Sequence, residues 1–187
     1  MLKEYDKLTS AQIYKLMSQT VIPRPIAWIV TQDEDILNVA PFSYFIPLSS
    51  KPATLIVSIG HKEDKTPKDT LANIRKNRLC TICFVNEENL EDMKKTALSL
   101  PKDESEVKKY NLKTKEILED FPPIISSTKT AFFCELNQEL DLGGDTIPLL
   151  LHVKAQYIDD EIIDSQDNIS LDNIARVGKS FAKLQMI

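Results

Sequence analysis

The chain has 187 residues, which suits one domain, so we expect 1–187 to fold as a single unit. Its composition is 42% hydrophobic and 27% charged, which argues against disorder. A net charge of −5 without a block of basic residues argues against nucleic acid and anionic membrane as partners. No apolar run approaches the ~18 residues of a membrane-spanning helix, and no signal-peptide pattern is visible, so we expect a cytoplasmic protein.

The N-terminal part is predicted to contain one short helix followed by strands. Thr9 and Gln12 have the spacing of a capping box, and an apolar stripe recurs at helical intervals over 9–18. Apolar runs bounded by turn residues predict strands over 25–31, 36–42 and 54–60. The second strand follows the first across a polar turn, which favours antiparallel pairing. Prolines and serines over 47–52 predict a loop before the third strand.

The third predicted strand has two unlike faces. Alternation places Leu55 and Ile59 on one face and Ser58 and Gly60 on the other. The second face becomes small and polar toward the end of the strand, where a flat ligand ring could approach the backbone closely. A strand end that simply merges into a loop explains the pattern equally well.

A helix start is predicted directly after this strand. Thr66 has the position of an N-cap, Pro67 that of the first helical residue, and Asp69 lies three residues after the cap. Lys68 and Thr70 add a cation and a hydroxyl to the amide groups of the helix start, and a phosphate monoester binds such groups. The alternative is a capped, solvent-exposed helix without a ligand. A ring at the strand end and a phosphate at the helix start together predict flavin mononucleotide, FMN.

The second half is predicted to return to the sheet. We expect a strand over 79–85, a helix over 90–100 and a charged surface segment over 102–120 with a short helical piece near Tyr110. Two long strands, 130–140 and 146–158, are expected to form a hairpin across 142–145. The tail over 171–184 is expected to fold back as a helix or loop.

The cysteines and histidines do not predict a metal or redox centre. Cys80 and Cys83 have the C-x-x-C spacing, but residues three apart in a strand point to opposite faces, so they cannot share an ion. We interpret them as buried packing residues. His152 lies within an apolar run, and His61 suits a surface loop as well as a ligand contact. No dinucleotide-binding glycine motif, P-loop or nucleophile elbow is present.

Four segments in matching order resemble the flavin reductase-like, FMN-binding split-barrel family that includes flavoredoxins. They are Arg24-Pro-Ile-Ala-Trp28, the stretch from Asn38 to Phe45, Ser58-Ile-Gly60, and the stretch from Lys68 to Ile74. Weaker similarity continues through 131–136 to 174–178. The resemblance implies a mainly β fold, a Greek-key split β-barrel with peripheral helices, and a homodimer that binds FMN near the subunit interface.

The resemblance also implies roles for residues. Lys68, Asp69 and Thr70 would hold the phosphate, and Trp28 would border the ring. The ribityl chain and isoalloxazine would be lined by Phe42, Ser43, Tyr44, Ser58, Ile59 and Gly60. Arg176 would close the mouth of the site toward a nicotinamide or another electron partner. Arg24 and Asn38 fit packing or supporting roles equally well.

The expected function is an FMN-dependent oxidoreductase in which NADH or NADPH reduces the flavin and a small molecule or protein accepts the electrons. The alternative is a flavoredoxin-like electron carrier that does not itself oxidise NAD(P)H. A third hypothesis is a protein that keeps the fold and has lost the cofactor. In the tail, Gly178 lacks a second glycine that relatives often have, and Phe181 replaces a common aromatic hydroxyl, which leaves the reductant site open.

Overall fold

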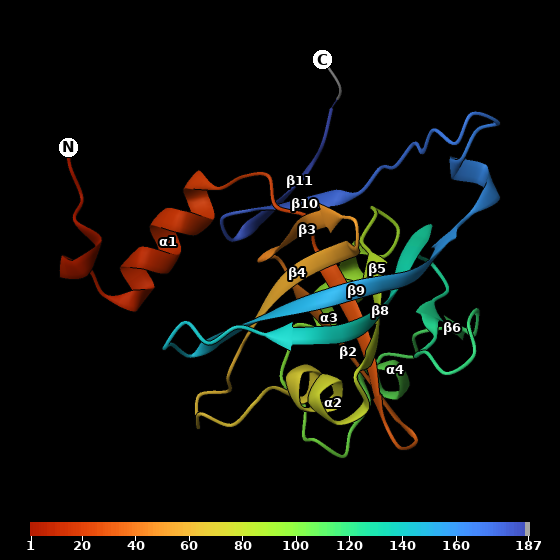
Figure 1. Ribbon diagram of the computed structural model, residues 1–187, viewed down its shortest axis with the longest axis horizontal. Coiled ribbons are helices and arrows are strands. Elements are labelled where there is room, and N and C mark those ends of the chain that lie inside the picture. Colours follow the sequence, from red (N-terminus) through yellow and green to blue (C-terminus); the bar gives the residue numbers. More distant parts are fainter. Residues whose placement is uncertain (186–187) are drawn as a thin grey trace.

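The computed structural model describes residues 1–185, and its centre is one antiparallel sheet of seven strands (Figure 1). The strands are β1 (Ala27–Asp33), β2 (Ile36–Phe42), β3 (Phe45–Ser50), β4 (Ala53–Gly60), β5 (Leu79–Phe84), β8 (Thr130–Glu139) and β9 (Thr146–Ile158). They are arranged in the order β2-β1-β5-β8-β9-β4-β3, out of chain order as in a Greek key, and β2 approaches β4 across the sheet. The prediction of a mainly β fold is confirmed.

The helices and two small hairpins surround this sheet (Figure 1). The helices are α1 (Ser10–Thr20), α2 (Asp69–Asn77), α3 (Leu90–Lys95) and α4 (Glu106–Lys109), with 3₁₀ turns at Tyr5–Lys7 and Asp160–Ile162. The hairpins are β6 (Thr114–Lys115) with β7 (Ile124–Ile125), and β10 (Ile174–Val177) with β11 (Ser180–Lys183). Within residues 1–185, the helices are too short or too polar to cross a membrane.

Several local predictions are confirmed. Thr9 and Gln12 form the reciprocal capping box at the start of α1. β1 and β2 pair antiparallel, and β8 and β9 form the expected hairpin. In β4 the buried residues alternate with partly exposed ones as the pattern indicated. Each of these features depends on residues close together in the chain, so local spacing was sufficient to predict it.

Two segments predicted as irregular are strands. The expected loop over 47–52 is largely β3, an edge strand whose register shifts between Pro47 and Ser49. An edge strand tolerates proline because one side of it has no ladder to support. The tail, expected as a helix or loop, is the β10–β11 hairpin, and its turn contains Gly178 at φ +55°.

The predicted helix over 90–100 was too long, because α3 ends at Lys95. Thr96 caps it, and the Thr96 hydroxyl donates to the Met93 carbonyl at 2.8 Å. The segment over 102–120 contains the short helix α4 next to Tyr110, as predicted, but it is not all surface. Ser105 and Glu106 are buried against the sheet.

Two hydrophobic clusters lie on opposite faces of β1 and β5. One contains Ile29 and Cys80 together with residues of α2, and the other contains Trp28 and Cys83. Both thiols are fully buried and neither forms a disulfide, which confirms the packing interpretation. Cys80 lies opposite Cys134 in the β5–β8 ladder, a neighbour that no sequence spacing indicated. β1 is therefore packed against apolar side chains on both of its faces.

Candidate functional site

A cavity of about 470 Å³ opens where the ends of β2 and β4 meet α3 and the C-terminal hairpin. Seven of the predicted site residues line it: Phe42, Ser43, Tyr44, Ser58, Gly60, Lys68 and Arg176. They come from four separate stretches of the chain, which the sheet brings together. The lining combines aromatic surface, hydroxyl groups and three cations, and this suits a flat, anionic ligand.

A narrower cavity of about 100 Å³ adjoins the first, because Phe42 and Lys68 line both. Asp69 and Thr70, the other two predicted phosphate residues, line this narrow part. Lys62 also lines it and was not predicted. The structure therefore brings the residues predicted for the ring and those predicted for the phosphate to adjoining parts of one site.

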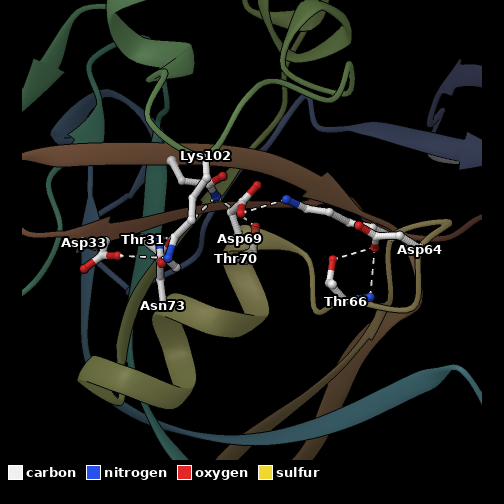
Figure 2. A network of polar contacts seen from close by, with 10 residues as sticks. Thr31, Asp33, Asp64, Thr66, Asp69, Thr70, Asn73 and Lys102 are labelled. Atoms are coloured by element: carbon white, nitrogen blue, oxygen red, sulfur yellow. Dashed lines mark hydrogen bonds and ion pairs between the residues drawn. The ribbon is translucent and has the colours of Figure 1, made fainter.

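The start of α2 differs from the prediction. The helix begins at Asp69 with Lys68 as its N-cap, so Thr66 is not the cap and Pro67 is not the first helical residue. The reason is local: the Asp64 carboxylate accepts from both the amide and the hydroxyl of Thr66, at 2.9 and 2.6 Å, as Figure 2 shows. Lys68 makes no side-chain capping bond, so the first amides of α2 have no side-chain acceptor from their cap.

A buried polar network holds Thr70 in place at this helix start (Figure 2). The Asn38 side-chain amide donates to the Thr70 hydroxyl oxygen at 2.9 Å, and the Asn73 amide donates to the Thr31 hydroxyl at 3.2 Å. Thr70 is only 1% exposed. A hydroxyl that accepts in this way still has its own proton to donate to a ligand. Asn38, a weak candidate on sequence, therefore orients Thr70.

Charged groups of both signs surround the narrow cavity. Lys62 pairs with Asp69 at 2.9 Å, and the Lys68 ammonium lies 5.8 Å from the centre of the Phe42 ring. Glu106 also lines the cavity, and burial raises the pKa of its carboxyl, with a further rise from the nearby Asp69 charge. Glu106 was not predicted as a site residue, because the many charged residues over 102–120 indicated a segment exposed to solvent.

Aromatic and cationic side chains form the mouth of the wider cavity. The Arg176 guanidinium lies 4.4 Å from the centre of the Phe181 ring, and Lys94 lies 5.4 Å from the same ring. Tyr14 of α1 stacks on Tyr44, with 6.1 Å between ring centres. Tyr14 and Lys94 were not predicted as site residues. Their contribution depends on the packing of α1 and α3 beside the sheet, which no local motif indicates.

Two predicted residues do not line either cavity. Trp28 is fully buried, and its indole N–H donates to the Thr96 hydroxyl at 2.9 Å. Ile59 is also fully buried, in the cluster on the opposite face of β4 from Ser58. Because β1 is covered on both of its faces, Trp28 lies in the core, and its contact with a ring stays a prediction.

A second, larger hollow of about 770 Å³ lies away from these residues, against the segment over 116–123. Its charged lining is acidic, from Glu34, Glu116, Glu119 and Asp120, and it contains none of the predicted site residues. Among residues 1–185, no group of three or more His, Cys, Asp or Glu side chains is arranged to hold a metal ion. The candidate site is therefore the pair of adjoining cavities, which has the chemistry to bind an anionic aromatic ligand.

Comparison with known proteins identifies the class. A family model described as a flavin reductase like domain matches residues 17–169, and the chain belongs to this family. The uncharacterized protein YwrF of Bacillus subtilis (strain 168) is 33% identical over 190 residues, which cover 96% of this chain and 92% of that protein. Membership of this family supports flavin-related oxidoreductase activity and a flavin cofactor.

Two solved structures extend the comparison. Nitrilotriacetate monooxygenase component B from Bacillus cereus is 25% identical with a TM-score of 0.93, covering 100% of this chain and 96% of that one. A putative flavin reductase with a split barrel domain from Shewanella frigidimarina NCIMB 400 is 20% identical with a TM-score of 0.84, covering 97% and 92%. The fold is therefore a split barrel, as the resemblance implied.

Proposed function

We propose that this protein is an FMN-binding oxidoreductase in which NADH or NADPH reduces the flavin and a small molecule or a protein accepts the electrons. The observation that carries the proposal is the adjoining pair of cavities. The wider one is lined by the strand-end residues, and the narrower one by the uncapped start of α2 with Lys68 and Thr70. This arrangement fits a ring system joined to a phosphate monoester.

The donor set at α2 suits a phosphate. Helix-start amides, a lysine ammonium and a threonine hydroxyl are the groups that bind phosphate oxygens most favourably. Lys68 and Thr70 would hold the phosphate, while Asp69 would keep Lys62 in position through their ion pair. Ser43 and Ser58, which line the wider cavity, would face the ribityl chain and ring. The bound flavin supplies the reversible two-electron chemistry.

The remaining residues orient ligands and limit solvent. Tyr44 stacks with Tyr14, and both line the wider cavity, so this wall offers aromatic surface to a ring. Arg176 places a cation at the mouth, where it would attract the phosphates of a nicotinamide nucleotide or an acidic partner. A protein nucleophile is not required, because hydride and electron transfer are carried out by the cofactors.

Similarity to a monooxygenase component favours a second protein as the electron acceptor. The Bacillus cereus protein is named as a component of a monooxygenase, and it is 25% identical over all of this chain. We therefore include a partner enzyme that uses reduced flavin among the acceptors to test. We expect the activity in the cytoplasm, without nucleic acid or membrane as a partner.

We also propose a homodimer, on the evidence of exposed apolar side chains on α1, at its C-cap Val21 and on β3. Met17 and Val21 are 40% and 58% exposed, and Ile46 and Leu48 are each 53% exposed. Apolar residues that gather on neighbouring surface elements commonly mark an interface. Light scattering after size-exclusion chromatography should give twice the chain mass. A monomer at all concentrations would contradict the proposal, and Leu48→Glu should shift a dimer toward monomer.

The decisive experiment is an absorbance spectrum of the purified protein, followed by anaerobic addition of NADH or NADPH. Flavin bands near ~450 nm that bleach on addition of the nucleotide, with turnover when an acceptor is supplied, would support the reductase. Bound flavin that stays oxidised would favour the electron-carrier alternative. Failure to bind FMN after reconstitution would contradict the site itself and favour a protein that has lost the cofactor.

A further inference from the structure

Glu106 is a buried acid beside the groups proposed to hold the flavin phosphate. It lines the cavity of about 100 Å³ together with Lys62, Lys68 and Thr70, and only 6% of it is exposed. A carboxylate in an anion site opposes binding unless a proton lies between it and the anion. Its presence there therefore requires a chemical explanation.

The Glu106 carboxyl is fixed by the sheet. Its Oε2 accepts from the Val39 amide of β2 at 3.0 Å, and the neighbouring Ser105 hydroxyl donates to the Leu37 carbonyl at 2.6 Å. These two bonds tie the start of α4 to β2. Rotation of the carboxyl toward solvent would leave the buried Val39 amide without its acceptor, which is unfavourable. Glu106 therefore stays beside the cavity when a ligand enters.

The charges that face Glu106 come from three elements. Asp69 of α2 raises its pKa, and Lys109 of its own helix lowers it, while burial has the largest effect and raises it. Lys62 and Lys68, from the loop before α2, line the same cavity, but Lys62 is already paired with Asp69. The two lysines are thus balanced by two carboxyl groups before any ligand is bound.

Further charged residues line a small hollow next to this cavity. Lys102 and Glu104 line a small hollow next to Asn38 and Asp69, and Glu104 pairs with Lys109 at 2.8 Å. Lys102 lies 3.9 Å from Asp33. Asp33 is also paired with Lys76, so both lysines share one carboxylate, while Glu104 faces Lys109.

We propose that Glu106 recognises the flavin phosphate as a monoester by sharing one proton with it, so that FMN binds with uptake of a proton. This inference rests on the proposed FMN site. A phosphate monoester has a second pKa near ~6 and can hold a proton between its oxygen and the carboxyl. The doubly esterified phosphates of FAD lack that second ionisation. Glu106 therefore favours the mononucleotide over the dinucleotide.

The test measures the dissociation constants of FMN, FAD and riboflavin by fluorescence between pH 6 and pH 8. For the unmodified protein, FMN should bind more tightly as the pH falls, approaching tenfold per pH unit, the limit for one proton. Riboflavin, without a phosphate, should bind with little pH dependence. In Glu106→Gln, which keeps an acceptor for Val39, FMN should bind more tightly at pH 8, and its affinity should be constant or fall toward pH 6.

The control is Glu119→Gln, which removes an exposed carboxyl in the distant acidic hollow and should leave every constant unchanged. The preference for FMN over FAD should decrease only in Glu106→Gln. Equal pH dependence in the unmodified protein and Glu106→Gln would overturn the inference while leaving FMN binding intact. Absence of FMN binding at every pH would overturn the proposed function as well.

A second measurement does not require the variant to fold. Calorimetric titration of the unmodified protein with FMN, in two buffers of different ionisation enthalpy, counts the protons taken up. Close to one proton for FMN near pH 7, and close to none for riboflavin, would support the inference. Equal proton numbers for the two ligands would overturn it.

Discussion

The two longer helices of the molecule begin in opposite ways. At the start of α1, the Thr9 hydroxyl accepts from the Gln12 amide at 3.3 Å, and the Gln12 side chain accepts from the Thr9 amide at 2.9 Å. At the start of α2, the N-cap residue Lys68 makes no such bond. The α1 start is exposed to solvent, whereas the α2 start lines a cavity together with Lys62 and Thr70.

This difference shows how a helix start can serve either the fold or a ligand. Helix-start amides need acceptors, and in α1 the chain supplies them from its own side chains. At the start of α2 the polar groups nearby include donors, Lys62 and Thr70, which are held in position by Asp69 and Asn38. An anionic ligand would complete this set of donors. The comparison therefore predicts that changes at the start of α2 alter ligand affinity, while changes at the start of α1, at Thr9 and Gln12, alter stability alone.

The largest expected effect is the loss of FMN affinity in the double variant Lys68→Ala with Thr70→Ala. Each charge-assisted hydrogen bond to the phosphate contributes about 1.5–3 kcal/mol, so affinity should fall at least a hundredfold. Fluorescence titration with FMN measures it. Lys65→Ala, which removes an exposed lysine of the same loop, should have little effect. Unchanged affinity in the double variant would refute the phosphate assignment.

A smaller effect is expected for Asn38→Ala, which removes the support of Thr70. The loss of a buried hydrogen-bonded partner should lower the free energy of unfolding by about 1–3 kcal/mol. FMN affinity should fall as well, but less than in the double variant, because Thr70 itself remains. Urea denaturation and FMN titration measure the two effects. Asn137→Ala, which removes an exposed asparagine of β8, is the matched control, and equal losses in both variants would contradict the role of Asn38.

Thr9→Ala should break the capping box of α1 and cost about 1 kcal/mol of unfolding free energy. FMN affinity should be unchanged, because neither Thr9 nor Gln12 lines a cavity of the candidate site. The measurements are the same urea curves and titrations. A loss of FMN affinity comparable to that of Asn38→Ala would show that the two helix starts are not functionally different.

The contrast between the helix starts also shows what the sequence could predict. Thr9 and Gln12 interact with each other three residues apart, so their spacing was enough. Thr66 has the same apparent signal, but Asp64 takes both its amide and its hydroxyl, and the helix begins later. Local spacing does not show that a neighbouring carboxylate binds the residue expected to cap the helix. The assignment of Lys68 and Thr70 to a phosphate stays a prediction, because both residues lie within the first turn or at the cap whichever residue begins the helix.

The site residues that were missed or misplaced all depend on contacts distant in the chain. Glu106 is buried only because α4 packs on β2, and Tyr14 reaches the cavity only because α1 lies beside Tyr44. Trp28 was expected to border the ring, and its indole N–H donates to Thr96, 68 residues away, a contact that no local motif indicates. The alternation of apolar residues fixed the strands, but it did not reveal what covers each face.

The smallest expected effect is a pH dependence of stability that the start of α2 has and the start of α1 lacks. α1 has no acidic residue in its first turn, whereas α2 begins beside Asp69 and Glu106. Burial, and then Asp69, raise the pKa of Glu106 in the folded chain. Between the unfolded value and this raised value, the folded chain holds the proton more tightly than the unfolded chain. The free energy of unfolding therefore has a component from Glu106 that is present at low pH and is lost as the pH rises through that window.

Urea denaturation of the ligand-free protein and of Glu106→Gln at several pH values between about 4 and 8 isolates this component. Other carboxyls, such as Glu139 beside Arg75, have lowered pKa values and give the opposite slope, but they are the same in both proteins. The difference in unfolding free energy between the two should shift in favour of Glu106→Gln as the pH rises. Parallel curves would mean that the folded and unfolded chains hold this proton equally, and Glu106 would then not be the buried acid that separates the two helix starts.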